Sequence, residues 1–120
     1  MYTRHATGIS GEKLARDFLV RQNYSIIATN YRCKAGEIDI IALKDNKLAF
    51  IEVKTRSSDK KGLPHEAYTY GKMKRLSRAI QYYIHTEKPS VQKYACHLLS
   101  ILYTEGKPVI KLYENAPMTL

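Results

Sequence analysis

Residues 37–43, EIDIIAL, and residues 48–54, LAFIEVK, are two short apolar runs rich in Ile, Val and Phe. Between them lie residues 44–47, KDNK, a composition typical of a turn. Two apolar runs of strand length that are joined by a short turn indicate a pair of antiparallel strands. The sequence therefore predicts a β-hairpin over residues 37–54.

Outside the hairpin, the residue pattern predicts two helices and three more strands. Apolar residues at helical spacing indicate the helices, and runs of β-branched and aromatic residues indicate the strands. In chain order the predicted elements are helix 9–22, strand 25–32, the hairpin, loop 55–71, helix 72–87, strand 93–103, strand 108–113 and tail 115–120. The order α-β-β-β-α-β-β predicts one α/β domain over residues 1–120, with a mixed β-sheet flanked by helices.

Composition narrows the classes of function. The chain has 120 residues, of which 44% are hydrophobic and 26% are charged, which is ordinary for a globular domain. No apolar run is long enough for a transmembrane helix, and no signal peptide is visible, so we expect a cytoplasmic protein. The cysteines are few and far apart and the histidines lack zinc-ligand spacing, so neither a disulfide nor structural zinc is expected.

The charge of the chain points to a polyanionic partner. Twenty Lys and Arg face eleven Asp and Glu, which gives a net charge of +9. Such a balance favours nucleic acid first and an anionic membrane surface second. The alternative is a basic surface that is merely solvated. No basic amphipathic helix typical of a membrane anchor is present, so nucleic acid is the expected partner.

The hairpin contains acids where apolar residues are expected, and a carboxylate in an apolar strand is costly unless it is paired or bound to a metal. If residues 45–46 or 44–47 form the turn, the numbers of facing residues add up to 91, so Asp39 faces Glu52 and Glu37 faces Lys54. Facing residues share one face of the hairpin. The opposite face would then carry apolar side chains, namely Ile38, Ile40, Ile51 and Val53.

Two carboxylates opposed in this way repel each other, and a divalent cation relieves that repulsion. Hard oxygen ligands suit Mg²⁺ or Mn²⁺. Lys54 adds an ammonium group that could orient water or neutralise a phosphate, and such a set suits phosphodiester hydrolysis. The alternative is a structural salt bridge between Glu37 and Lys54, with Asp39 and Glu52 in solvent.

The segments GEIDIIA at residues 36–42 and FIEVKTR at residues 50–56 resemble the central signature of the YraN-like family. These small bacterial proteins, long described as uncharacterised, are placed in the PD-(D/E)xK nuclease superfamily. The resemblance covers nearly the whole chain and includes Gly8, Gly11, Glu12, Ala15, Phe18, Leu19, Asn30, Tyr31, Arg32, Glu66, Ala67, Lys72 to Leu76, Ala79, Tyr82 and Tyr83. It implies a restriction-endonuclease-like fold and metal-dependent cleavage of nucleic acid, with DNA favoured over RNA.

The resemblance also implies roles for single residues. Asp39 and Glu52 match the acidic positions that bind the metal, and the carbonyl of Val53 could complete the inner shell. Lys54 matches the motif lysine. Glu12 is similar to a glutamate on the first helix of archaeal Holliday-junction resolvases; the alternative is an acid favoured by the dipole of the first helical turn.

Three other positions flank the motif residues or depart from the family pattern. Glu37 is expected to tune Lys54 or to contact a second metal. Ile38 stands where the superfamily usually has proline, as the YraN-like family tolerates. Cys96 and His97 occupy the region where family members often carry an aspartate; either that loss weakens the case for activity, or His97 substitutes for the aspartate, or the position is structural.

Basic residues follow the motif and continue along the second helix. Those expected to contact nucleic-acid phosphates are Arg56, Lys60, Lys61, Lys72, Lys74, Arg75 and Arg78. Tyr68 and Tyr70 either stack on unpaired bases or pack in the core. Two other functions stay open: a nucleic-acid-binding module without catalysis, and a protein-interaction subunit. A homodimer also stays open, because a junction resolvase needs two copies to cut two strands.

Overall fold

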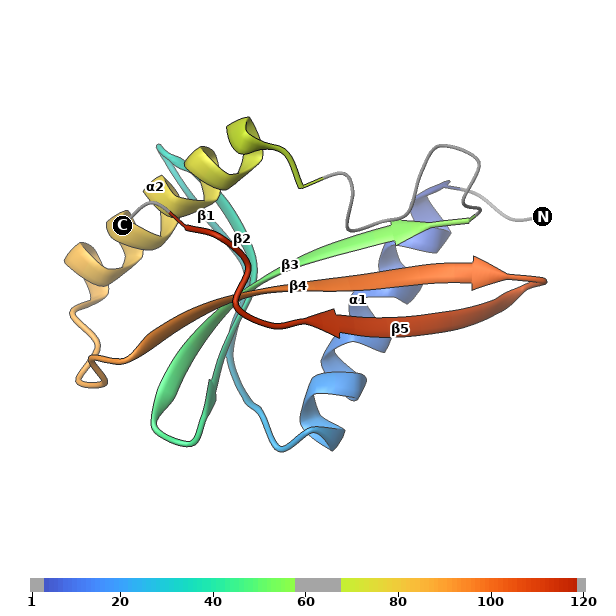
Figure 1. The fold of residues 1–120 in the computed structure, drawn as a ribbon, viewed down its shortest axis with the longest axis horizontal. Coiled ribbons are helices and arrows are strands. Elements are labelled where there is room, and N and C mark those ends of the chain that lie inside the picture. The colour runs from blue at the N-terminus through green and yellow to red at the C-terminus, as the bar shows by residue number, and fades with distance from the viewer. Residues whose placement is uncertain (1–3, 58–67, 119–120) are drawn as a thin grey trace.

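The computed structural model describes residues 4–57 and 68–118, and side chains from residue 11 onward within these ranges. The elements are α1 (Arg4–Arg21), β1 (Ser25–Cys33), β2 (Gly36–Lys44), β3 (Lys47–Arg56), α2 (Tyr70–Glu87), β4 (Tyr94–Thr104) and β5 (Lys107–Tyr113). This order confirms the predicted α/β class, and Figure 1 shows the mixed sheet with its two helices. Each strand lies within two residues of its predicted bounds.

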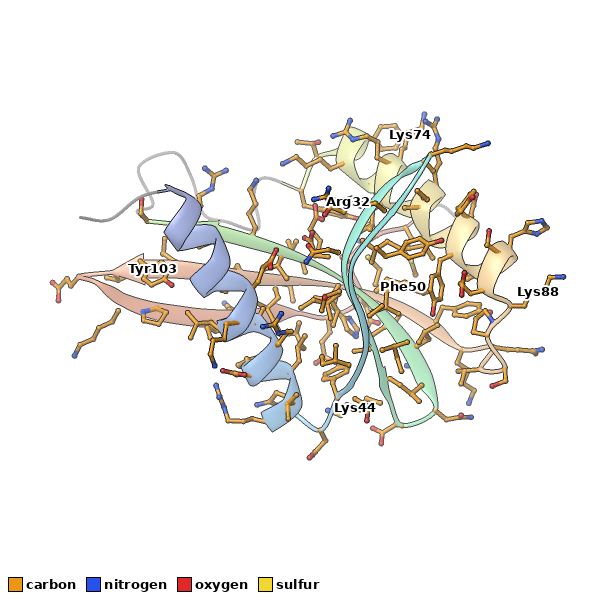
Figure 2. The ribbon with its side chains drawn as sticks, turned by 180° about the vertical axis from the view of Figure 1, so that it is seen from behind. Arg32, Lys44, Phe50, Lys74, Lys88 and Tyr103 are labelled. Carbon is orange, nitrogen blue, oxygen red and sulfur yellow. The ribbon has the colours of Figure 1, made fainter. Side chains whose placement is uncertain are left out.

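The five strands form one sheet in the order β1-β2-β3-β4-β5. Strands β3 and β4 are parallel, and the other neighbours are antiparallel. A parallel pair needs a crossover connection, which α2 provides between β3 and β4. Helix α1 lies behind the sheet in Figure 1, and the reverse view in Figure 2 shows it in front.

Two apolar cores hold the helices to the sheet, one on each face. The core on the α1 side includes Leu19, Ile40 and Ile51. The core on the α2 side includes Phe50 and Ile80, and Figure 2 shows Phe50 between the sheet and α2. The sheet is thus buried on both faces at its centre, which explains why the strands read as nearly continuous apolar runs.

Both helices begin earlier than the sequence predicts. Helix α2 starts at Tyr70 because the Thr69 hydroxyl caps it, accepting a hydrogen bond from the backbone N–H of Lys72 at 3.3 Å. Helix α1 starts at Arg4 and continues through Gly11, a poor helix former. A Cβ added at Gly11 would lie 2.5 Å from Oγ1 of Thr55, so glycine is what allows α1 to lie this close to β3.

The predicted hairpin register is confirmed for the half of the hairpin next to the turn. Asp45 and Asn46 form the turn with positive φ values of 51° and 60°, and the ladder runs from Lys44↔Lys47 to Ile40↔Ile51. Beyond that pair the ladder stops. Strand β2 stays with β1 as far as Gly36, while β3 stays with β4 as far as Arg56. We call this divergence of β2 and β3 the fork.

The expected face assignment of the hairpin is wrong at two residues, Ile38 and Asp39. Ile40 and Ile51 pack on the α1 side and Val53 packs against the same core, as predicted. Ile38 instead packs in the core on the α2 side. Asp39 lies beside Ile40 and Val53 on the α1 side, whereas Glu52 lies on the α2 side. Two residues apart on one strand normally share a face, so the alternation of β2 breaks at Asp39, where the fork begins.

The described part of the predicted tail packs against the sheet. The backbone N–H of Ala116 donates to the Cys96 carbonyl at 2.7 Å, and the Tyr68 hydroxyl donates to the Pro117 carbonyl at 2.7 Å. Ala116 and Met118 contact the core on the α2 side. Among the described residues, no helix combines the length and apolar character needed to cross a membrane.

Candidate functional site

Asp39 lies at the fork, immediately after the last β2–β3 pair. Its Oδ2 accepts a hydrogen bond from the backbone N–H of Val53 at 2.8 Å. A buried backbone N–H needs an acceptor, and the ladder no longer supplies one from β2 at this point. The Asp39 side chain therefore replaces a ladder bond and reaches from β2 across to β3.

The carboxyl groups of Asp39 and Glu52 interact at the fork, although the predicted ladder pair between these residues does not form, because the β2–β3 ladder ends at Ile40↔Ile51. Burial raises the pKa of Asp39 to about 7, although the hydrogen bond from Val53 opposes the rise. The negative charges of Glu52 and Glu37 and a side-chain hydrogen bond with Glu52 raise this pKa further. The fork thus concentrates negative charge that a proton, or a cation, would neutralise.

Lys54 follows on the same strand, two residues after Glu52. Burial lowers its pKa, and the charge of Lys72 on α2, a side-chain hydrogen bond with Lys72 and the charge of Arg56 lower it further, while Glu52 opposes them. The neighbour of Lys54 is therefore Lys72, where a hairpin continued in register would have supplied Glu37. The amine of Lys54 therefore releases a proton more readily than the amine of an exposed lysine does.

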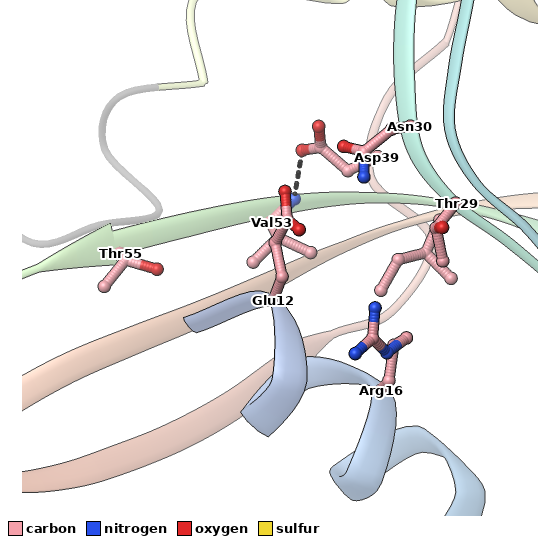
Figure 3. A pocket seen from close by; sticks show the side chains of 8 residues that line it. Glu12, Arg16, Thr29, Asn30, Asp39, Val53 and Thr55 are labelled. Atoms are coloured by element: carbon pink, nitrogen blue, oxygen red, sulfur yellow. Dashed lines mark hydrogen bonds between the residues drawn. The ribbon is translucent and has the colours of Figure 1, made fainter. Parts of the chain in front are cut away.

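A hollow of about 180 Å³, which we call the α1-side hollow, opens between α1 and the fork (Figure 3). Its lining residues are Glu12, Arg16, Thr29, Asn30, Asp39, Ile40, Val53 and Thr55. Glu12 leans toward the site, as its helical position predicted, and Figure 3 shows its carboxyl group directed toward Asp39 and Val53.

Sequence reasoning missed four polar residues of this hollow, namely Arg16, Thr29, Asn30 and Thr55. Arg16 lies one helical turn after Glu12, and this spacing of four was the signal that could have found it. Thr29 and Asn30 come from β1. Their position depends on an irregularity in the β1–β2 register between Ile26 and Ala28, which no local sequence pattern marks.

On the other side of the fork lies a second hollow of about 190 Å³, the α2-side hollow. Its lining residues are Gly36, Glu37, Glu52, Lys72, Arg75 and Leu76. Lys72 and Arg75, two of the predicted phosphate contacts, therefore lie beside Glu52. Glu37 does not face Lys54, because the β2–β3 ladder ends before Glu37. Glu37 instead forms an ion pair with Arg32, with 3.4 Å between Arg32 Nε and Glu37 Oε1.

The remaining basic residues differ in their placement. Among the described residues, the buried Nε of Arg56 has no hydrogen-bond partner. The Lys74 ammonium lies 5.4 Å from the centroid of the Tyr70 ring, and Arg78 is exposed and lines neither hollow. Lys60 and Lys61 lie outside the described residues.

The two loop tyrosines have different environments. Tyr68 is partly buried against the core on the α2 side and is fixed by its hydrogen bond to Pro117, so it has a packing role. Tyr70 is 67% exposed. Of these two tyrosines, Tyr70 is therefore the one whose ring surface could stack on an unpaired base.

His97 occupies a position away from the fork. It is 4% exposed, and its Nδ1 accepts a hydrogen bond from the backbone N–H of Asn115 at 3.0 Å. Burial lowers its pKa. His97 lines a separate hollow with Tyr24, Lys44 and Glu114 and not the fork. Its burial and its hydrogen bond to the backbone support a structural role for this histidine.

The oxygen donors at the fork are compatible with a hard divalent cation. Among the side chains that the structure describes, those of residues 11–57 and 68–118, no group of three or more His, Cys, Asp or Glu could hold a metal ion. The donor set is the pair Asp39 and Glu52, with the Val53 carbonyl as the backbone donor that the motif implies. Mg²⁺ is commonly held by one or two carboxylates and keeps several waters, so a pair of carboxylates is a sufficient set.

Comparison with known proteins finds one family. The model of the uncharacterised protein family UPF0102 matches residues 11–101. A UPF0102 protein of Clostridium perfringens (strain SM101) is 48% identical over 81 residues, covering 68% of this chain and 66% of the relative. A UPF0102 protein of Caldicellulosiruptor saccharolyticus is 40% identical over 111 residues, covering 91% of this chain and 94% of the relative. The matched region contains the fork and both hollows.

Proposed function

The chain belongs to the uncharacterised protein family UPF0102, and from the chemistry of its forked sheet we propose that it is a metal-dependent endonuclease that hydrolyses nucleic-acid phosphodiester bonds, DNA foremost. The observation that carries the proposal is the meeting of Asp39 and Glu52 at the fork, beside Lys54. The motif resemblance to YraN-like members of the PD-(D/E)xK superfamily supports the same conclusion.

Asp39 and Glu52 would hold Mg²⁺ or Mn²⁺, with the Val53 carbonyl as a further ligand. The fit rests on the buried Asp39 carboxyl group, whose pKa is raised to about 7 by burial first and by the negative charges of Glu52 and Glu37 second, so that a bound cation would favour its ionised form. When bound, the ion would lower the pKa of a coordinated water and neutralise charge on the phosphate.

The remaining residues bind and orient the substrate. Hydrolysis adds a water oxygen to phosphorus and breaks the bond to the leaving sugar oxygen, which takes up a proton. Lys54, with its lowered pKa, would accept a proton from the attacking water or stabilise the pentacoordinate phosphate of the transition state. Lys72 and Arg75 would hold phosphate oxygens from the α2-side hollow. Glu12, across the α1-side hollow, is the accessory acid.

A second candidate is a nucleic-acid-binding protein of the same fold that does not cleave. One observation favours it: within the described ranges, the fork has no third Asp, Glu, His or Cys side chain in a metal-binding group. Binding would then depend on the basic residues and on the net charge of +9, and would be sensitive to salt.

One experiment separates the two candidates. Wild-type protein and the Asp39→Asn/Glu52→Gln variant are incubated with labelled single-stranded, duplex, flap and four-way-junction DNA, and with RNA of the same sequence, in Mg²⁺, Mn²⁺ or EDTA. The matched control is Asp17→Asn/Glu87→Gln, which removes the same charge away from both hollows. We expect metal-dependent products from wild type and control and none from the fork variant.

The outcomes are distinct. Binding by all three proteins without any product would replace the nuclease with the binding protein. Equal cleavage by wild type and the fork variant would exclude Asp39 and Glu52 as the reactive pair. Absence of both binding and cleavage would overturn the two candidates together.

A further inference from the structure

We infer that the α1-side hollow binds an internal phosphate of the substrate strand, next to the phosphate that is cleaved, through Arg16 and Asn30. This inference rests on the proposed function and adds a substrate contact to it. It concerns the side of the fork opposite to Lys72 and Arg75, so the reactive carboxyl groups would lie between two phosphate contacts.

Arg16 is the cationic wall of this hollow. The residue is half-buried on α1, and Figure 3 shows its guanidinium directed into the space below Thr29. Glu12 lies four residues earlier, yet the ion pairs formed within the described residues are Lys13–Asp17 and Arg32–Glu37. A half-buried guanidinium that forms neither of these ion pairs, although its charge also acts on Asp17, can bind a phosphate through two parallel hydrogen bonds.

Asn30 is held in the hollow by an unusual backbone conformation. Its φ is +52°, a value that asparagine tolerates better than most residues. Thr29 and Asn30 both line the hollow, so the usual alternation of β1 breaks at Asn30. The positive φ within the strand accounts for Asn30 lying on the same side of the sheet as Thr29.

The break at Asn30 coincides with the break at Asp39 on the neighbouring strand. The β1–β2 register pairs Thr29 with Ile40 and Tyr31 with Ile38, so Asn30 and Asp39 are opposite each other. Tyr31 and Ile38 both pack on the α2 side, whereas Asn30 and Asp39 both line the α1-side hollow. The two strands thus turn the Asn30 amide and the reactive carboxylate into one space.

The chemistry of this space selects a phosphate. Arg16 supplies positive charge and a planar pair of donors, and Asn30 supplies a neutral amide donor. An internal phosphodiester carries one negative charge and two free oxygens, which matches both groups. The carboxylates of Glu12 and Asp39 line the same hollow and would repel the phosphate unless a cation neutralised them. We therefore expect the protein to bind DNA more tightly in the presence of a divalent ion.

The test measures binding without turnover. Affinity for a short fluorescein-labelled single-stranded DNA is followed by anisotropy against salt, in Ca²⁺ and in EDTA, for wild type, Arg16→Gln, Arg16→Lys, Asn30→Asp and Asn30→Gly. Lys13→Gln, on the exposed face of the same helix, is the matched loss of charge. Thermal melts check folding, and Asn30→Gly keeps a residue that accepts positive φ.

We expect Arg16→Gln to weaken binding about tenfold and to reduce the salt slope by about one. Arg16→Lys should recover part of the loss, because it keeps the charge without the paired donors. Asn30→Asp should weaken binding more than Asn30→Gly, because it adds a negative charge where the phosphate would lie. Lys13→Gln should change the slope less than Arg16→Gln.

A chemically modified substrate makes the test specific for one phosphate. A methylphosphonate, which lacks the negative charge, is placed at each internal position in turn. At one position it should weaken binding by wild type but not by Arg16→Gln. If no position depends on Arg16, or if Arg16→Gln binds like wild type, the inference is overturned even where wild-type cleavage upholds the proposed nuclease. If wild type binds no nucleic acid, both proposals fail.

Discussion

The Asp39 carboxylate accepts a hydrogen bond from the Val53 backbone N–H at 2.8 Å, across the point where strands β2 and β3 separate. The same carboxylate is therefore a structural link and the centre of the candidate site. Its burial and its carboxylate neighbours oppose ionisation. The protonated form of Asp39 is the one that favours the folded state, whereas binding a metal ion would require the ionised form. The pH dependence of unfolding measures this opposition.

The first prediction concerns the pH dependence of folding in EDTA. Between 3.8, the ordinary pKa of aspartate, and about 7, the folded state keeps an Asp39 proton that the unfolded state has released. Stability from this group is therefore present at low pH and lost as the pH rises through about 7. The loss is at most about 4 kcal/mol. Asp39→Asn should remove it, so the variant should be more stable than wild type at pH 8.5 by denaturant unfolding.

Asparagine keeps an oxygen that can accept the Val53 N–H, so the link across the fork is retained in this variant. Asp17→Asn is the control, because Asp17 is in an exposed pair with Lys13. The hydrogen bond from Lys13 lowers the pKa of Asp17, so above about pH 5, where this group is ionised in both the folded and the unfolded state, the profile of the control should run parallel to that of wild type. An Asp39→Asn protein that is less stable than wild type at pH 8.5 would contradict the raised pKa.

The second prediction concerns metal ions. At pH 8, saturating Mn²⁺ or Mg²⁺ should raise the melting temperature of wild type, because an ion that binds only the folded state stabilises it, by about 2.7 kcal/mol at one hundred times its dissociation constant. Asp39→Asn/Glu52→Gln should show no such rise. Calorimetric titration of the same proteins gives the stoichiometry. Equal shifts in both proteins would place the ion elsewhere.

Local patterns were sufficient to predict the hairpin. The turn at Asp45 and Asn46 and the apolar runs beside it gave the correct register from Lys44↔Lys47 to Ile40↔Ile51. The fork could not be predicted in the same way. It arises because β3 continues beside β4, for example in the pair Glu52↔Leu98, and that contact is far apart in sequence.

The same reasoning explains which site residues were found. Asp39, Glu52 and Lys54 lie close together in sequence, and their chemistry is visible in a linear motif. Arg16 and Asn30 reach the α1-side hollow only through tertiary contacts: one needs the packing of α1 on the sheet, and the other needs a break in strand alternation. Such irregularities carry weak sequence signals.

The third prediction concerns the contact between α1 and β3. Gly11→Ala should destabilise the protein by about 1–3 kcal/mol, although alanine is the better helix former by about 1 kcal/mol. The reason is that its Cβ would meet Thr55 Oγ1 at 2.5 Å and force the helix away from the strand. Denaturant unfolding at fixed pH measures the change.

A double-mutant cycle tests this explanation. Thr55→Ala removes the obstructing oxygen, so Gly11→Ala should cost less, or even stabilise, in the Thr55→Ala background. Because Glu12 follows Gly11, Gly11→Ala alone should also disturb the α1-side hollow and weaken nucleic-acid binding. An equal cost of Gly11→Ala in both backgrounds would show that the contact with Thr55 is not the cause.

The fourth prediction concerns His97, which burial keeps neutral. Its Nδ1 accepts the Asn115 N–H, and a protonated ring cannot. Burial lowers its pKa, while Glu114 opposes this effect and Lys47 and Lys44 add to it. Below the ordinary histidine pKa of 6.5 the unfolded chain takes up a proton that the folded state resists, so stability should fall as the pH drops.

In the variant His97→Asn, the amide oxygen can replace Nδ1 as the acceptor and does not titrate. Asp39 is present in both proteins, so its contribution cancels when the unfolding free energy of wild type is subtracted from that of the variant. This difference should shift in favour of the variant from pH 7 to pH 5. A difference that is constant over this range would show that the folded protein binds a proton at His97 as readily as the unfolded chain does.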